Sequence, residues 1–69
     1  MTKLEQNIIN GLRKLVTDEL RKEYAATNDK YLLALDHARY GLDMSLPMNS
    51  DRTDLIVETF ENMLEGETQ

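Results

Sequence analysis

Apolar residues in the first third of the chain recur every three or four positions, and this spacing constrains the fold more than any other feature. They stand at Leu4, Ile8, Ile9, Leu12, Leu15, Val16 and Leu20. At about 100° per residue, these positions fall on one stripe of an α-helix. Thr2 and Glu5 have the spacing of a capping box, in which each side chain bonds the backbone of the other residue. The pattern therefore predicts a helix over residues 3–25.

A change in the direction of the apolar stripe predicts a second helix over residues 29–40. Its expected buried face comprises Tyr31, Ala34, Leu35, Ala38 and Leu42. A heptad pattern continued from the first helix would put Glu19 and Lys30 at core positions, which argues for a break between the two. We expect Thr27 or Asn28 to cap the second helix. One continuous helix is the alternative.

Gly41 is expected to end the second helix as its C′ residue. The loop over residues 42–49 follows, and its leucine and methionine side chains are expected to cover the ends of the core. Asn49 or Ser50 then caps a third helix over residues 51–64, with acidic residues in the first turn, where the helix dipole favours them. Three helices with short connections predict a bundle.

The small size of the chain makes its stability depend on helix packing and association. It has 69 residues and no cysteine, so neither a disulfide nor a cysteine-based metal site can support the fold. A single core of this size contributes roughly 3–5 kcal/mol. Gly11, within the first helix, is expected to allow close approach of another helix. The sequence predicts an all-α single domain over residues 1–69, a small three-helix bundle completed by oligomerisation.

The N-terminal segment and the overall charge limit the location and the partners. Residues 1–7 lack the basic start and apolar stretch of a signal peptide, and no apolar run approaches the roughly 20 residues that span a bilayer. Together with the absence of cysteine, this favours a cytoplasmic location. The net charge of −5 at pH 7 disfavours direct binding to nucleic acid or anionic membranes and favours a basic partner.

The clearest surface feature is a row of five carboxylates in the third predicted helix, which we call the acidic row. It comprises Asp51, Asp54, Glu58, Glu61 and Glu65. Spacings of three and four residues place these side chains within roughly 80° of the helical wheel. Leu55, Ile56, Phe60, Met63 and Leu64 are expected to cover the other side. The row is interpreted as a solvated face, or as a docking surface for a basic partner, mimicking the charge of nucleic acid. A cation site is a further alternative, although the spacing does not suit calcium, which binds oxygen ligands clustered on a loop.

A second candidate surface lies on the second predicted helix, opposite its main buried stripe. Leu33 and Tyr40 stand seven residues apart there, and two exposed apolar side chains on so small a chain predict contact with a second copy or a partner. Arg39, next to Tyr40, is a candidate contact for an anion. His37 is expected to be a surface residue and not a metal ligand.

No arrangement of residues predicts catalysis. Ser45 and Ser50 have no histidine nearby in sequence and no glycine-rich elbow, and the chain has no phosphate-binding loop. Carboxylates could hold two metals in a helical bundle, but the Glu-x-x-His pair that such sites use is missing. Glu19, which falls within the apolar arc of the first helix, is expected to form a salt bridge at the rim of the core. We therefore expect no enzyme, no metal and no cofactor.

The leading functional hypothesis is a small, acidic, non-enzymatic module that associates with itself and that binds and modulates another protein. One alternative is a phage-type inhibitor that mimics nucleic-acid charge through the acidic row. Another is a protein that binds or sequesters a small anionic ligand, such as a nucleotide, at a subunit interface. Small acidic helical chains without cysteine are common among bacterial and phage accessory proteins, which is a statement about composition alone.

Overall fold

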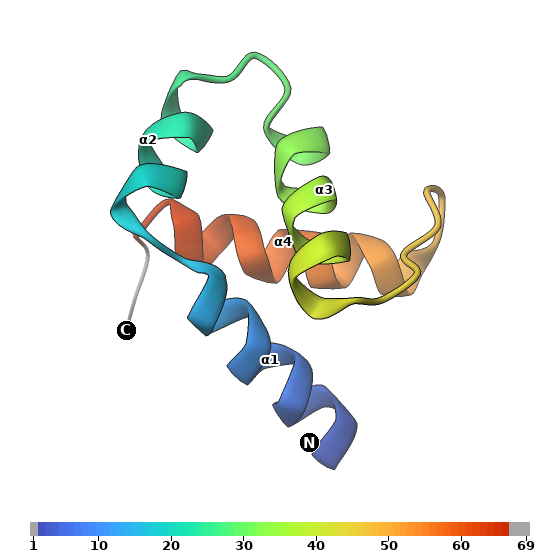
Figure 1. Cartoon of the computed structure of the whole chain (residues 1–69). Helices are drawn as coiled ribbons and strands as arrows, with labels where there is room; N and C mark the ends of the chain where they lie inside the picture. Colours follow the sequence, from blue (N-terminus) through green and yellow to red (C-terminus); the bar gives the residue numbers. More distant parts are fainter. Residues whose placement is uncertain (1, 67–69) are drawn as a thin grey trace.

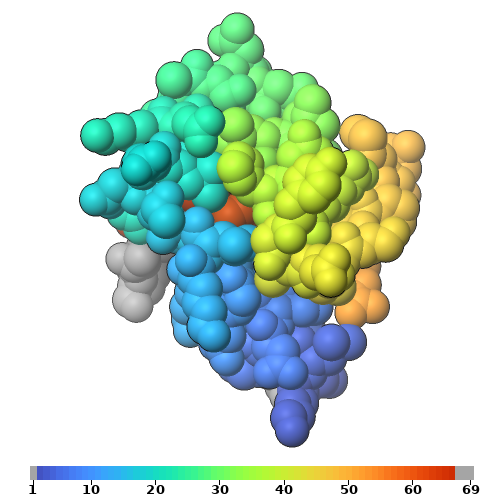
Figure 2. Space-filling view, in the orientation of Figure 1, coloured from blue at the N-terminus to red at the C-terminus, as the bar shows by residue number. Residues whose placement is uncertain are grey.

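The computed structural model describes residues 2–66 and forms four α-helices over that part of the chain. The helices are α1 (Lys3–Leu15), α2 (Asp18–Ala26), α3 (Lys30–Leu42) and α4 (Asp51–Leu64). Figure 1 shows α4 running behind the other three helices. In the space-filling view, the N-terminal helices and α3 cover most of α4 (Figure 2). The expected all-helical fold is confirmed, with four helices in place of three.

The predicted first helix is broken at Val16 and Thr17, and this corrects the expected span of residues 3–25. The backbone of both residues is extended, and the Thr17 side chain accepts a hydrogen bond of 3.1 Å from the Leu20 N–H as the N-cap of α2. Two β-branched residues in succession favour this extended conformation. One continuous helix would place Glu19 within the apolar arc. In the structure the chain changes direction at the break before α2, and Glu19 is exposed.

The capping box at the start of α1 forms as predicted. The Thr2 hydroxyl oxygen accepts a hydrogen bond of 3.1 Å from the Glu5 N–H, and the Glu5 carboxylate accepts one of 2.8 Å from the Thr2 N–H. These bonds to the charged carboxylate lower the pKa of Glu5. The side chain is therefore a negative charge at neutral pH.

A short link joins α2 to α3, and side chains at both of its ends bond the free backbone groups of the two helices. Asp29, one residue after the expected caps, accepts a hydrogen bond of 3.1 Å from the Leu32 N–H and is the N-cap of α3. The Lys30 ammonium donates to the carbonyl oxygens of Tyr24 and Ala25, at 2.8 and 3.4 Å. A cation at this position satisfies carbonyl groups that the end of α2 leaves free.

The end of α3 lies at Asp43 and not at Gly41. Asp43 adopts the left-handed conformation, with φ of 54°, and the Met44 N–H bonds the Arg39 carbonyl at 3.1 Å. This bond from the residue after the left-handed position closes the helix as in a Schellman motif. In the following loop Leu46 is buried and Met44 is half-buried, as expected, whereas Met48 is exposed.

The two helical glycines serve the packing of α1 against α3. A Cβ on Gly11 would lie 2.5 Å from the Leu42 Cδ2 atom, and a Cβ on Gly41 would overlap both methyl groups of Leu15. Each glycine thus receives a leucine of the opposite helix. The close approach expected at Gly11 is confirmed, and Gly41 is explained by packing in place of helix termination.

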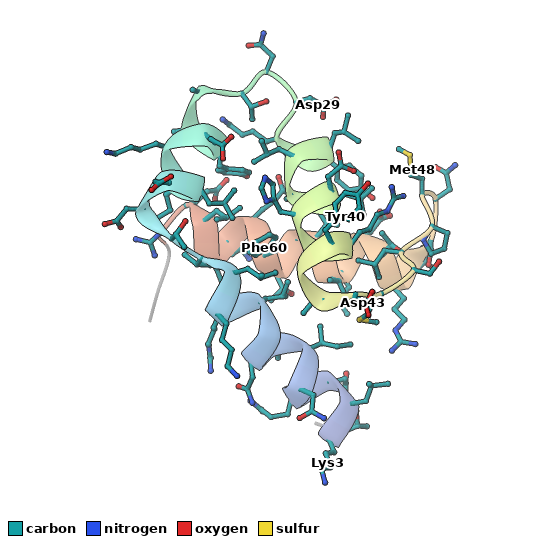
Figure 3. The ribbon with its side chains drawn as sticks, viewed as in Figure 1. Lys3, Asp29, Tyr40, Asp43, Met48 and Phe60 are labelled. Carbon is teal, nitrogen blue, oxygen red and sulfur yellow. The ribbon has the colours of Figure 1, made fainter. Side chains whose placement is uncertain are left out.

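The core lies where α4 meets the other helices. The side chains that are fully buried and largest are Phe60, Leu12, Leu35, Val57 and Thr53. Phe60 lies near the middle of the molecule (Figure 3). The predicted face of α3 is confirmed, since Ala34, Leu35 and Ala38 are buried. Ser50 caps α4, as one of the two expected residues. On α4, the sequence predicts Leu55 among the apolar residues that cover the core, but it is 62% exposed.

Candidate interaction surfaces

Tyrosine hydroxyls from neighbouring helices bind three of the five carboxylates of the acidic row. Tyr24 on α2 lies with its hydroxyl oxygen 2.9 Å from Glu61 Oε2 and 3.1 Å from Glu65 Oε2, and these two carboxylates share its single proton. Tyr31 on α3 donates to Asp54 Oδ1 at 2.7 Å. Hydrogen bonds to ionised groups are short and strong. These bonds therefore hold one edge of the row in defined positions.

Tyr24 is the best-buried member of this network. It is 3% exposed, and the Lys30 ammonium lies 4.9 Å from the centre of its ring, in a cation–π arrangement. Burial and the two carboxylates raise the pKa of the Tyr24 hydroxyl above its ordinary value near 10. The hydroxyl is therefore a neutral donor at physiological pH, and it leaves the negative charge of the row in place.

Within residues 2–66, no cation of the chain forms an ion pair with a carboxylate of the acidic row. The ion pair found in that part joins Arg39 Nη1 to Asp36 Oδ1 at 3.7 Å on α3. The positive charge of Arg39 also acts on the Tyr31 hydroxyl, which donates to Asp54. Asp51 and Glu58 are exposed, like Asp54 and Glu65, while Glu61 is half-buried. Four of the five row residues thus lie on α4 and Glu65 is its C-cap, and none of the five forms an ion pair within the described part of the chain.

The predicted surface on α3 is only partly present. Tyr40 is 85% exposed, but Leu33 is half-buried and packs against the core. The apolar pair expected there is thus reduced to one tyrosine, which the fold leaves at the surface beside the exposed Leu32. His37 is exposed, as expected.

Arg39, the candidate anion contact, has a structural role. Its Nε–H donates to the Leu46 carbonyl at 2.9 Å, and its guanidinium faces Asp36. These contacts fasten the loop after α3 onto the helix. An anion contact at Arg39 stays a prediction.

An apolar groove that the sequence did not predict lies between α1 and α4, and we call it the α1–α4 groove. Its volume is about 130 Å³, and it is lined by Glu5, Ile8, Ile9, Leu12, Arg52, Leu55, Ile56 and Thr59. Leu55 is the most exposed leucine on its walls. The width of the apolar arc on α4, from Leu55 round to Leu64, is the signal that could have revealed it, because one core contact does not need so broad an arc.

A second, shallower hollow continues along α1 beyond the groove. Arg13, Val16, Arg21 and Met63 line it, and Arg21 Nη2 donates to the Met63 carbonyl at 3.4 Å. The walls of these two hollows carry Glu5 at one end and Arg13 and Arg21 at the other. Both signs of charge therefore meet on this side of the molecule, whereas the acidic row carries one.

Within the described residues, neither a cluster of metal-binding side chains nor a helix that could span a membrane is found. Between Thr2 and Gly66, no three His, Asp or Glu side chains converge closely enough to hold a metal ion. None of the described helices combines the length and the apolar character that crossing a membrane requires. Comparison with protein-family models, curated proteins and solved structures finds no match to this chain.

Proposed function

We propose that this chain is a small, acidic, non-enzymatic interaction module that binds and modulates another protein, and that the acidic row on α4 is its contact surface for a basic partner. One observation carries the proposal. Tyr24 and Tyr31 orient three carboxylates of the row without neutralising them. A solvent-exposed face does not require its side chains to be held in fixed positions. Side chains that are already ordered lose less conformational entropy when a complex forms, which favours binding.

The charge density of the row supports a protein partner. Its five carboxylates extend over 14 intervals of the helix, or about 21 Å at 1.5 Å per residue, which gives one charge per about 5 Å. A single DNA strand presents one phosphate per 3.4 Å of axis. The row is thus about two thirds as dense as one strand. Basic side chains on a protein surface can match this spacing, and association is expected to be fast and dependent on salt.

A mimic of nucleic-acid charge is the second candidate. It is favoured by the same straight, one-signed row, and it differs from the first proposal in the site that the partner uses. A mimic must compete with a nucleic acid for the partner's own binding surface. Competition by single-stranded or duplex DNA for the captured partner therefore separates the two candidates.

Two variants with equal charge test the proposal. In the row variant, Glu58, Glu61 and Glu65 are changed to Gln, and in the control variant Glu19→Gln, Glu23→Gln and Asp43→Asn remove three exposed charges elsewhere. Each set lowers the negative charge by the same amount. Both variants and the unmodified chain are used as bait in lysate of the native host, and captured proteins are identified by mass spectrometry.

We expect a basic protein to be captured by the unmodified chain and by the control variant, and to be lost with the row variant. A partner captured equally by all three baits would contradict a role for the row. Thermal unfolding of each bait, followed by circular dichroism, confirms that the row variant is folded at the temperature of the assay.

A further inference from the structure

We infer that the α1–α4 groove is the contact between two copies of this chain, packed about a twofold axis with their α1 helices antiparallel. The inference goes beyond the proposed function and does not rest on it. The groove lies on the flank of α4 that faces α1, whereas the tyrosine-bound carboxylates lie on the flank that faces α2 and α3.

The groove has the apolar centre that a helix contact needs. Leu55 stands on one wall with 62% of its surface exposed, and Ile9 stands half-buried on the other. Ile8, Leu12 and Ile56 form the rest of the apolar lining. A contiguous apolar surface between two helices is the kind of site that accepts a further helix.

The order of side chains along α1 identifies a second copy as the occupant. Glu5, Ile9 and Arg13 are four residues apart and lie along one edge of the helix. Glu5 and Ile9 line the groove, and Arg13 lines the hollow that continues from it. Along this edge an acidic residue is followed by an apolar one and then by a basic one, and Ile9 lies midway between the charges of Glu5 and Arg13.

A twofold axis through Ile9 makes this edge complementary to itself. In an antiparallel pair, Ile9 meets Ile9 of the other copy, Glu5 of each copy faces Arg13 of the other, and both pairs form at once, as an isologous interface requires. Bonds to Thr2 lower the pKa of Glu5, so this carboxylate is charged at neutral pH.

The distribution of charge over the rest of the molecule agrees with this arrangement. The net charge of −5 opposes association of two copies in general. The groove and the adjoining hollow are lined by one acidic and three basic side chains, namely Glu5, Arg13, Arg21 and Arg52. This face thus carries a net charge of +2 (three basic minus one acidic side chain), against −5 for the acidic row, so it repels a second copy less than the row does and leaves both acidic rows free.

The first test measures the mass of the full chain in solution. Sedimentation equilibrium over about 1 to 300 µM covers the affinities of weak and moderate contacts. We expect the average mass to rise from the 8.0 kDa monomer towards that of a dimer. Leu55→Ser should weaken association by about tenfold or more, because it removes an apolar side chain from the centre of the contact. The matched control, Leu32→Ser, changes an exposed leucine on α3 (41% exposed) and should leave association unchanged.

The second test uses charge. Glu5→Lys alone and Arg13→Glu alone each place like charges opposite one another in the dimer, so each variant should associate more weakly than the unmodified chain. An equimolar mixture of the two variants restores opposite charges at both pairs, and a heterodimer should form. Thermal unfolding of the separate variants, at a concentration where they are monomers, verifies that each is folded.

Three results would overturn the inference. They are a monomer throughout the concentration range, an association that Leu32→Ser or Tyr40→Ser weakens and Leu55→Ser does not, and a mixture of charge variants that stays monomeric. None of these results bears on the acidic row. A monomer that still captures a basic partner in a row-dependent way would refute the dimer and leave the proposed function intact.

Discussion

Gly41→Ala tests the packing of α1 on α3 most sharply, because two opposing effects of known size meet at this position. Alanine in a helix interior is about 1 kcal/mol more favourable than glycine. The added methyl group, however, would overlap both methyl groups of Leu15 and lie 2.9 Å from its Cγ atom. Rotation about χ2 of Leu15 cannot clear its Cγ atom, so either Leu15 changes its χ1 rotamer or the helices shift, and overpacking of this kind costs about 1–3 kcal/mol.

We therefore expect Gly41→Ala to lower the free energy of unfolding by about 1 kcal/mol. Gly11→Ala is the matched comparison, because its new Cβ would clash closely with one atom only, the Leu42 Cδ2 at 2.5 Å, and the next atom is 4.0 Å away. A rotamer change of Leu42 can relieve that contact. The gain in helix propensity should then offset the clash, and the net change should stay within about 0.5 kcal/mol.

The assay is urea unfolding followed by circular dichroism at one fixed protein concentration, since association would add to the apparent stability. Sucrose in every sample keeps weakened variants folded. In a Leu15→Ala background the clash is absent, so Gly41→Ala should change sign and stabilise the chain by about 1 kcal/mol. If Gly41→Ala stabilises the chain in both backgrounds, the close contact between Gly41 and Leu15 does not exist.

Further predictions concern the tyrosine network and the helix caps. Tyr24→Phe should lower stability by about 1–2 kcal/mol, because it removes the hydroxyl donor that Glu61 and Glu65 share. The pKa of Tyr24 is raised in the folded chain, so the unfolded chain loses this proton at a lower pH than the folded chain. The contribution of Tyr24 to the free energy of unfolding is therefore fully present below about pH 10 and decreases above it. In Tyr24→Phe, the alkaline fall measured by urea unfolding at stepwise pH should be smaller, and an unchanged fall would contradict the buried hydroxyl. Lys30→Met should cost about 1 kcal/mol, because it removes the donor to the end of α2 and the cation above the Tyr24 ring. Thr17→Ala should cost about 1 kcal/mol as loss of an N-cap, whereas Asn28→Ala should change the urea midpoint little, because Asp29 is the N-cap of α3. A larger loss for Asn28→Ala than for Thr17→Ala would contradict these two caps.

Local chemistry made several parts of the fold predictable. The capping box of Thr2 and Glu5, the cap at Ser50 and the buried face around Leu35 depend on residues within one or two turns, and all are present. The break before Thr17 was missed because Val16 and Leu20 continue the four-residue spacing across it. The acid pair Asp18 and Glu19 after a threonine was the available signal, since it is typical of a helix start.

Contacts between distant residues could not be predicted from the sequence. The acidic row follows from helical spacing, but its tyrosine donors are 23 to 41 residues away in the chain. Helical periodicity likewise places Leu55 on the apolar side of α4 without showing which edge a neighbouring helix covers. The position of α1 decides that Ile56 is buried and Leu55 is not.

The most direct test of the proposed function is the affinity for a row-dependent partner at two salt concentrations. The dissociation constant is measured by titration calorimetry at about 50 and 200 mM salt, where screening differs strongly, for the unmodified chain, the row variant and the control variant of equal charge. We predict that the row variant binds about tenfold more weakly at low salt and depends less on salt, while the control variant behaves like the unmodified chain. Equal affinities and equal salt dependence for the two variants would show that net charge, and not the acidic row of α4, governs binding.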